Sequence, residues 1–268
     1  MNNAKLQLDA GNLDGAIESA LALVKQNPTN IAARTFLFEL SCFSGQWDRA
    51  EKQLEVIGHQ EVGATIGSKI YQQNLKAERD RINVFNSKSA PGTAMAMPDY
   101  VEQLLIGNQL LQDGDTAGAR EAFDKVEAER PAFRCKINGE AFSDFRDYND
   151  LTSCVFEVII KDTYAWLPFE HAVRIEFLER RSLRDVYWLQ AQVEWANGTN
   201  GEVFIPSLYV NTWKNSNDAV RLGRTVEWRD AGDDIYVGEG TRIFAVNGRD
   251  IPILDIQTIE FELDSDEE

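Results

Sequence analysis

The sequence predicts an α+β protein, with an N-terminal tetratricopeptide-like α-α superhelix followed by a mainly antiparallel β, barrel-like C-terminal domain. Two observations lead to this prediction. Apolar residues recur at helical spacing up to Pro131, and a glycine–alanine pattern returns after 34 positions, from Gly11 to Gly45. After Pro131 the apolar period changes towards two, the period of a half-buried strand. We therefore expect domains over residues 1–131 and 132–268.

The helical half opens with a repeated pattern. Residues 11–28 read GNLDGAIESALALVKQNP, and residues 45–57 repeat the rhythm as GQWDRAEKQLEVI. A glycine begins each stretch, Ala16 or Ala50 follows, and larger apolar residues recur one turn apart. Tetratricopeptide hairpins need glycine at the turn and a small residue where the two helices touch. The stretch 11–28 is thus predicted to be the second helix of a hairpin whose first helix is short, as in many terminal repeats.

The pattern continues with one interruption. A third copy, GDTAGAREAFDKVEAERP, begins at Gly114. Residues 61–85 lack the glycine–alanine pattern but place apolar residues near helical spacing, which predicts a longer, degenerate helix. Residues 87–98, SKSAPGTAMAMP, predict a loop because they are rich in small residues and contain two prolines. Three recognisable copies meet the usual minimum for a stacked core, so we expect a superhelix of hairpins.

The C-terminal half is predicted to be a compact antiparallel sheet or small barrel filled by aromatic side chains. Its candidate strands are short, rich in Val, Ile and aromatics, and separated by Gly, Asn and Asp. Residues 197–201, NGTNG, predict a tight hairpin between two of them. Residues 141–151, AFSDFRDYNDL, predict a short helix or turn at the entrance. The candidate strands are 154–160, 163–167, 172–178, 187–195, 202–205, 224–228, 241–246 and 256–262.

The composition narrows the classes of partner. The chain has 268 residues, of which 43% are hydrophobic, enough for a sizeable core. It carries 27 Lys and Arg against 44 Asp and Glu, a formal net charge of -17 that repels phosphate backbones and anionic lipid headgroups. We therefore expect neither nucleic acid nor a membrane surface as a partner. A basic protein surface would be attracted, although acidity serves only solubility in many proteins.

Two further features predict a cytoplasmic protein. No apolar run approaches the roughly 20 residues that span a bilayer, and the opening MNNAKLQLDAGN lacks the basic and apolar regions of a signal peptide. The cysteines Cys42, Cys135 and Cys154 are far apart and form no CxxC pair. They are therefore predicted to be small buried residues in a reducing compartment.

The residues that catalysis needs are scarce. Hydrolysis by a Ser–His–Asp or Cys–His arrangement requires a histidine beside a nucleophile, and neither His59 nor His171 has a catalytic sequence context. No spaced cluster of Cys and His predicts zinc, and residues 238–241, GEGT, are too short and too acidic to cradle a phosphate. We therefore predict no catalytic residue, no metal ligand and no cofactor.

One acidic constellation supports an alternative hypothesis. Asp144, Asp147 and Asp150 recur every third residue in SDFRDYND, and in a loop they could hold a hard cation through oxygen ligands. Their spacing is not that of a calcium loop, Arg146 lies among them, and caps or turn bonds are the commoner use of such residues. A metal-dependent enzyme using this Asp cluster is the alternative, and an oligomeric scaffold is a third. The sequence leaves the oligomeric state open.

A superhelix of hairpins offers a concave groove lined by the first helix of each repeat, and such grooves hold a peptide or a helix. These helices are residues 31–43 in the second copy and 100–112 in the third. We expect the groove face of both helices to bind the partner. The predicted partner-binding residues are Thr35, Glu39, Phe43, Leu104, Asn108 and Gln112. Phe43 and Leu104 could equally be ordinary core contacts.

Specific stretches also carry a family resemblance. They are the second repeat, AARTFLFELSCFSGQWDRAEKQLEVI, and then FRDYNDL, YAWLPFEHAVRIEF, RSLRDVYW, NGTNGEVFIPSLY, AVRLGRTVEW and GTRIFAVNGRDIPILDIQTIEF. In this order they resemble the ImpE family, also called TagJ or SciE-like, over nearly the whole chain. The W-P-F-E, L-R-D and L-G-R series is not generic repeat chemistry, so the resemblance is specific.

The resemblance implies a cytoplasmic, non-enzymatic accessory or adaptor protein of bacterial type VI secretion. The contractile sheath of this machine is dismantled by a hexameric AAA+ ATPase of the ClpV type. Family members are described as binding the small contractile-sheath subunit, with a proposed link to that ATPase. The family fold, a helical-repeat region joined to an α+β, barrel-like region, agrees with the fold predicted from periodicity. The resemblance carries no catalytic residues.

Overall fold

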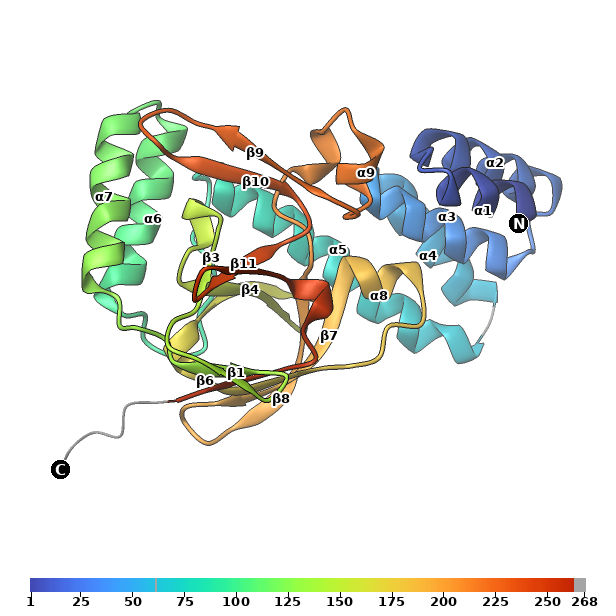
Figure 1. Cartoon of the computed structure of the whole chain (residues 1–268). Helices are drawn as coiled ribbons and strands as arrows, with labels where there is room; N and C mark the ends of the chain where they lie inside the picture. Colours follow the sequence, from blue (N-terminus) through green and yellow to red (C-terminus); the bar gives the residue numbers. More distant parts are fainter. Residues whose placement is uncertain (61, 263–268) are drawn as a thin grey trace.

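A computed structural model of the chain describes residues 1–60 and 62–262 (Figure 1). Residue 61, which begins the helix predicted over 61–85, and residues 263–268 of the predicted C-terminal domain lie outside this description. The first half is helical, as predicted. Its helices are α1 (Asn2–Asp9), α2 (Leu13–Gln26), α3 (Ile31–Phe43), α4 (Trp47–Gln60), α5 (Thr65–Phe85), α6 (Asp99–Gln112) and α7 (Thr116–Glu129), with a 3-10 turn η1 (Val62–Ala64).

The repeat residues do what the pattern predicts. Gly11, Gly45 and Gly114 stand at the three hairpin turns with φ values of 78°, 68° and 86°, a left-handed conformation that other residues adopt only with strain. Ala16 and Ala50 are fully buried where their helices touch the preceding ones. A side chain at Gly45 would also collide with Trp213, since a Cβ there would lie 2.4 Å from the indole. The second turn is therefore fitted to the C-terminal half.

The third hairpin does not continue the stack of the first two. Helices α1 to α5 pack in succession, whereas α6 packs mainly on α7 and makes only slight contact with α5. Figure 1 shows α6 and α7 at one end of the molecule, α1 to α4 at the other, and the sheets between them. The 21-residue α5 carries the chain from one end towards the other and packs on β5. The expectation of one groove running across α3 and α6 is therefore wrong.

The second half is antiparallel β structure, as predicted. The change from helix to strand lies between Glu129 and Cys135; as a boundary between independent domains, residue 131 stays a prediction. The strands are β1 (Cys135–Ile137), β2 (Glu140–Phe142), β3 (Arg146–Asp147), β4 (Val155–Ile160), β5 (Thr163–Pro168), β6 (Ala172–Phe177), β7 (Trp188–Trp195), β8 (Asn200–Pro206), β9 (Val226–Asp230), β10 (Tyr236–Gly240), β11 (Ile243–Val246), β12 (Arg249–Pro252) and β13 (Thr258–Phe261). Short helices and turns between them are η2 (Asp150–Thr152), η3 (Phe169–His171), α8 (Leu183–Tyr187), η4 (Thr212–Lys214), α9 (Asp218–Arg221) and η5 (Ile253–Asp255).

The main sheet has eight strands in the order β2-β1-β13-β6-β7-β8-β4-β5, and neighbouring strands are antiparallel. The NGTNG turn joins β7 to β8, so the predicted hairpin is confirmed. The order ends at β2 and β5, which makes an open sheet, and a barrel is not confirmed.

Gly92, in the predicted 87–98 loop, covers the β5 edge of this sheet. Its N–H donates to the Tyr164 carbonyl at 3.0 Å, and its carbonyl accepts from the Trp166 N–H. The hairpin β9–β10 and the three strands β12-β11-β3 form two smaller sheets.

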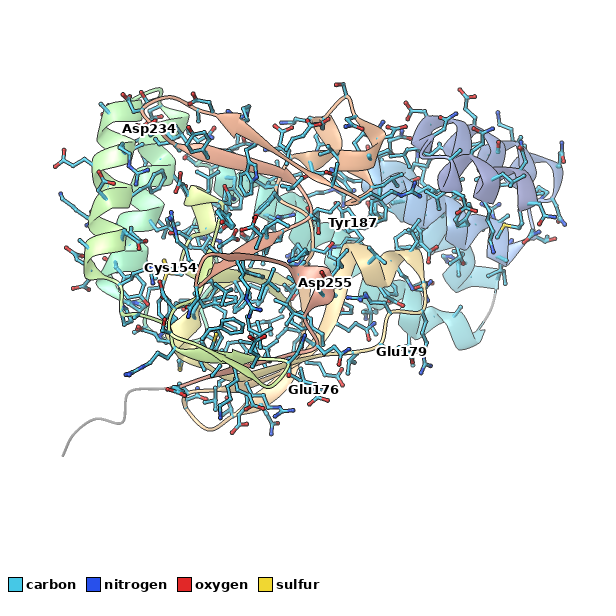
Figure 2. The ribbon with its side chains drawn as sticks, viewed as in Figure 1. Cys154, Glu176, Glu179, Tyr187, Asp234 and Asp255 are labelled. Carbon is cyan, nitrogen blue, oxygen red and sulfur yellow. The ribbon has the colours of Figure 1, made fainter. Side chains whose placement is uncertain are left out.

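Phenylalanines fill the space between the main sheet and β11. Phe145 lies 4.5 Å from Phe244 and 4.9 Å from Phe169, and Phe156 lies 4.7 Å from Phe169, measured between ring centroids. The predicted aromatic filling is therefore present, with Phe rather than Trp at its centre. Figure 2 shows this crowded interior next to the buried Cys154.

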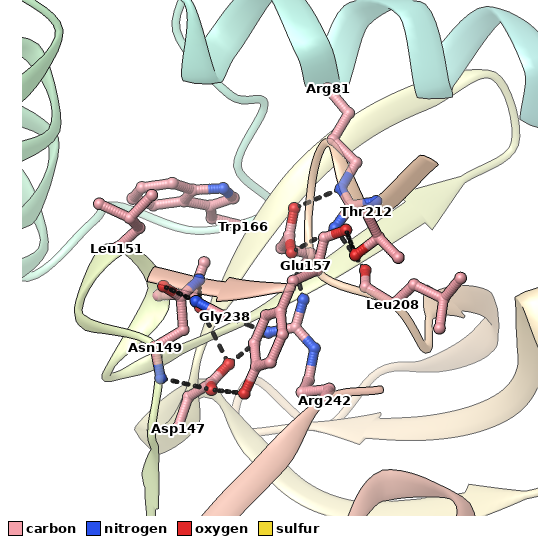
Figure 3. Close-up of polar contacts among 12 residues, drawn as sticks. Arg81, Asp147, Asn149, Leu151, Glu157, Trp166, Leu208, Thr212, Gly238 and Arg242 are labelled. Atoms are coloured by element: carbon pink, nitrogen blue, oxygen red, sulfur yellow. Dashed lines mark hydrogen bonds and ion pairs between the residues drawn. The ribbon is translucent and has the colours of Figure 1, made fainter. Parts of the chain in front are cut away.

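A buried ionic network joins the helical half to the β half (Figure 3). Arg81 of α5 donates to both carboxylate oxygens of Glu157 on β4, from Nε at 2.6 Å and from Nη2 at 2.9 Å. Arg242, just before β11, bonds the same Glu157 and also Asp147 of β3. These four side chains are almost completely shielded from solvent. We call them, with Glu78, the buried ionic network; Glu78 pairs with Arg81 at 2.9 Å.

Neutral groups complete the network. The hydroxyl of Tyr164 donates to Glu157 at 2.6 Å, the hydroxyl of Tyr209 donates to Asp147 at 2.8 Å, and Arg81 also donates to the Leu208 carbonyl. Burial opposes the charged form of Glu157, but the two adjacent guanidinium groups outweigh burial and lower its pKa to about 2. Glu157 is therefore charged in the folded protein under all ordinary conditions.

None of the helices in the described part of the chain combines the length and the apolar character that crossing a bilayer requires.

We expect Glu157→Gln to lower the free energy of unfolding by about 3–5 kcal/mol, because it removes the carboxylate shared by two buried guanidinium groups and leaves each with one counter-charge, Glu78 for Arg81 and Asp147 for Arg242. Urea unfolding followed by circular dichroism measures this. Glu176→Gln is the matched control: Glu176 is exposed on β6 and pairs with Arg174, and its loss should change stability by no more than about 0.5 kcal/mol. Equal effects of the two substitutions would contradict a central role for the network.

The depressed pKa of Glu157 predicts a pH dependence. Because its pKa falls from an ordinary 4.5 to about 2 on folding, the stabilisation is present above about pH 4.5 and is lost as pH falls through about 2. Between about pH 5 and pH 3, the stability gap between the unchanged protein and Glu157→Gln should therefore shrink by about 2 kcal/mol. Urea midpoints measured at both pH values test this, and a constant gap would show that Glu157 is not the titrating group.

Candidate functional site

The six predicted partner-binding residues lie in different environments. Glu39, Phe43, Leu104 and Asn108 are buried, whereas Thr35 is half-buried and Gln112 is exposed. Thr35, Glu39 and Phe43 belong to α3, and Leu104, Asn108 and Gln112 belong to α6. Helices α3 and α6 lie at opposite ends of the molecule (Figure 1). The structure therefore does not bring the six together into one surface. Their role as partner contacts stays a prediction.

The chain's own helix α8 covers the C-terminal part of the α3 groove face. Ser182 and Asp185 form a capping box that starts this short helix. The ring of Tyr187 at its end lies 5.0 Å from Phe43, edge to face. Arg184 Nη1 donates to Glu39 Oε1 at 2.7 Å. The α3 face holds a helix, as a repeat groove is expected to, but the helix belongs to the same chain.

Glu39 is therefore a structural residue in this protein. Burial raises the pKa of its carboxyl to about 6, although Arg184 acts in the opposite direction. A positive charge in place of Glu39 would lie against Arg184 in the same enclosed position. Charge reversal at Glu39 would thus disturb folding before it could report on a partner.

The residues on α6 serve a second internal contact. Leu104 is in the hydrophobic core. The Asn108 side-chain amide donates to the Leu151 carbonyl at 3.0 Å, which ties α6 to η2 in the β half. Only Gln112, in the last turn of α6, faces solvent freely. Leu104 and Asn108, which the sequence predicted to contact a partner, thus contact other parts of the same chain.

An open apolar cup remains at the N-terminal part of α3. We call it the α3–α5 cup; its volume is about 190 Å³, and it is lined by Ile31, Thr35, Phe38, Leu54, Ile57, Ala64, Gly67, Ser68, Tyr71 and Arg184. The guanidinium of Arg184 lies 5.2 Å from the ring centroid of Tyr71, at the border with α8. Of the predicted partner-binding residues, Thr35 is the one that lines this cup.

Exposed isoleucines adjoin the cup. Ile66 and Ile70 are one turn apart on α5 and are 76% and 38% exposed. Each directly precedes a cup residue, Gly67 or Tyr71. Neighbouring exposed isoleucines beside an apolar depression are typical of a surface that another protein covers.

The three aspartates of the alternative hypothesis point to different partners. Asp144 accepts two hydrogen bonds from Arg130, at 2.8 and 2.7 Å, and Asp150 accepts one from Arg146 at 2.6 Å. Asp147 belongs to the buried ionic network. Across residues 1–60 and 62–262, no group of three or more His, Cys, Asp or Glu side chains is placed to hold a metal ion. Nothing in this arrangement favours the metal-dependent enzyme.

The other candidate chemical groups are also used structurally. The exposed His59 contacts the Glu55 carbonyl of its own helix through Nδ1. The three cysteines are buried and free, as predicted, and burial raises the thiol pKa of Cys135 and Cys154 to about 12. These thiols are protonated and poor nucleophiles at neutral pH.

Of the ten residues that line the cup, only Thr35 was predicted to be a partner contact, and two of the others, Tyr71 and Arg184, show why. Tyr71 lies on the degenerate helix, and Arg184 lies in RSLRDVYW, far away in the sequence. The Ser182-x-x-Asp185 spacing is a capping-box signal that could have predicted α8. No local signal could have predicted that α8 packs on α3, because that contact joins residues about 145 positions apart, as in Arg184–Glu39.

Comparisons with known proteins agree with this architecture. A family described as "ImpE protein" matches residues 139–260, and a tetratricopeptide repeat family matches residues 7–73, which end within α5. The type VI secretion system accessory component TagJ of Pseudomonas aeruginosa is 30% identical over 255 residues, 95% of this chain and 89% of that protein. The crystal structure of protein VPA1032 from Vibrio parahaemolyticus matches with a TM-score of 0.89 over 97% of each chain, at 24% identity, and supports the fold.

The burial of Phe43 leads to a prediction. We expect Phe43→Ala to lower the free energy of unfolding by about 3–5 kcal/mol, because it opens a cavity between α3 and Tyr187. Gln112→Ala, at the exposed member of the predicted set, should change it by less than about 0.5 kcal/mol. Urea unfolding compares the two. A mild effect of Phe43→Ala would mean that α8 does not pack on α3 in solution.

Proposed function

The chain belongs to the ImpE family, which includes TagJ, and on this premise we propose that it is a non-enzymatic accessory protein of bacterial type VI secretion. It acts by binding another protein. The P. aeruginosa relative is named an accessory component of that system, and it aligns along almost the whole chain. The tetratricopeptide-like hairpins supply a scaffold of the kind that binds peptides and helices.

The partner in this proposal is a helical segment of the small contractile-sheath subunit. The observation that supports it best is the α3–α5 cup with the exposed Ile66 and Ile70 beside it. An amphipathic helix binds such a surface by placing one apolar anchor in the depression and others along its margin. The volume of about 190 Å³ suits a single large apolar side chain.

The non-enzymatic part of the proposal is supported by how the ionisable residues are used. Asp144 and Asp150 each face an arginine, the buried ionic network occupies Asp147 and Glu157, and the thiols are buried. These contacts stabilise the fold and give each of these carboxylates an arginine partner. A contact with the ClpV-type ATPase and a cytoplasmic location remain parts of the proposal that the family resemblance suggests.

We expect Thr35→Tyr to weaken binding of the small sheath subunit by about tenfold or more, because the added ring fills the cup. Ala32→Tyr is the matched control: it adds a ring to the same helix, at an exposed position that does not line the cup. The measurement is isothermal titration calorimetry between the folded full-length proteins, with thermal melting of each variant to verify folding.

The outcomes separate the two parts of the proposal. If the unchanged protein binds the subunit and both variants bind it equally well, the contact lies elsewhere and the cup is rejected. Absence of binding by the unchanged protein would reject the small sheath subunit as the partner.

A further inference from the structure

A second cavity lies at the end of the molecule opposite the α3–α5 cup, between α7 and the β9–β10 hairpin (Figure 1). Its volume is about 840 Å³. Three aromatic side chains, Tyr148, Trp228 and Tyr236, face Asp124 and Glu127 of α7 across it. We call these five residues and the space between them the aromatic groove. None of the five was predicted from the sequence as a partner contact.

The aromatic wall is exposed but held in place. Tyr148 and Trp228 are each 38% exposed and Tyr236 is 46% exposed. The Trp228 ring centroid lies 5.8 Å from that of Tyr148 and 5.6 Å from that of the buried Tyr209. Gly238 pairs with Trp228 across the hairpin, and a Cβ there would lie 2.4 Å from Tyr209 and 3.0 Å from Trp228. Tryptophan is common at interface hot spots, and a side chain that is already fixed loses little conformational entropy when a partner binds.

The opposite wall is fixed to the hairpin as well. Thr116, at the start of α7, donates its hydroxyl hydrogen to Asp233, and Arg120 approaches the carbonyl of Asp234 at 3.5 Å. Figure 2 shows Asp234 at the hairpin tip beside the α6–α7 pair. These contacts fix the tip of the hairpin to α7.

The groove is acidic where a ligand would enter. Its two arginines are engaged internally: Arg146 pairs with Asp150 at 2.6 Å, and Arg120 pairs with Asp124 at 2.8 Å. Glu127 pairs with Arg130 at 2.7 Å, but the side chains of Asp124 and Glu127 remain 69% and 46% exposed and can accept further hydrogen bonds. With Asp150 and Asp234, the lining carries four carboxylates against two guanidinium groups. The groove therefore attracts cations, and the net charge of -17 adds to this over longer range.

We propose that the aromatic groove binds an arginine-bearing segment of a protein partner. A guanidinium group stacks on an aromatic face and donates paired hydrogen bonds to a carboxylate, and this groove presents both surfaces opposite each other. Phosphate-bearing ligands are repelled by the same carboxylates. A wholly apolar helix would take the exposed carboxylates of Asp124 and Glu127 out of water without offering them a hydrogen-bond donor of its own.

This surface is separate from the α3–α5 cup and does not rest on the proposed function. Its ligand is recognised by charge and aromatic stacking, whereas the cup accepts an apolar anchor. Because the two surfaces lie at opposite ends of the molecule, the failure of one proposal leaves the other intact.

The test uses full-length protein labelled with 5-fluorotryptophan, whose six tryptophans give separate fluorine NMR signals. The Trp228 signal is assigned by its loss in Trp228→Phe. The probe is a short acetylated peptide of alternating arginine and alanine, and the matching glutamate–alanine peptide is the negative probe. We expect the arginine peptide to move the Trp228 signal selectively and the glutamate peptide to leave it in place.

Two charge variants decide whether the effect is local. Asp124→Asn combined with Glu127→Gln should weaken arginine-peptide binding about tenfold, because it removes the carboxylates opposite the aromatic wall. Glu18→Gln combined with Glu55→Gln removes the same charge from exposed positions on α2 and α4 and should change binding less than about twofold. An unmoved Trp228 signal, or equal weakening by both pairs, would overturn the proposal. So would a dimer in light scattering that Trp228→Ala dissociates, because the groove would then be occupied by a second copy.

Discussion

The buried ionic network is the interaction on which the arrangement of the two halves depends. Arg81 comes from the helical half, Glu157 and Asp147 from different sheets, and Arg242 from the segment before β11. An isolated charge in such a position costs several kcal/mol, so each member is tolerable only when the others are in place. The network therefore specifies one relative position of α5, β3, β4 and β11, in addition to any stability that it contributes.

That placement decides how the helical repeats are used. With α5 fixed against the sheet, the first two hairpins lie on one side and the α6–α7 hairpin on the other. Helix α8 then covers the part of α3 that a repeat protein would offer to a partner, through Tyr187 and Arg184. The repeats serve largely as internal packing, and the α3–α5 cup and the aromatic groove are two hollows that stay open among the described residues. If both proposals hold, the two proposed recognition surfaces lie at opposite ends of the molecule and could contact two partners, or two parts of one.

Much of the secondary structure could be predicted because its causes are local. The turn glycines, the buried alanines and the NGTNG hairpin each act within a few residues, and the structure confirms them. Strands β1, β2, β3, β10 and β12 were missed; they have two to five residues, and runs this short establish a period only weakly. Within 141–151, the expected turn is present as η2, and β3 is a two-residue strand that exists only through its pairing with β11.

Patterns along the chain were enough to predict the α+β class, the helical repeats, the antiparallel half and the ImpE family, because periodicity, turn residues and family motifs are all contained in short stretches of sequence. Which surfaces stay free depends on long-range packing, which these patterns do not contain. Phe43 and Glu39 have the spacing of groove residues, but whether they face a partner depends on α8, more than a hundred positions away. The aromatic groove shows the same limit: Tyr148, Trp228 and Tyr236 are scattered in sequence, and the folding of a hairpin against α7 brings them together.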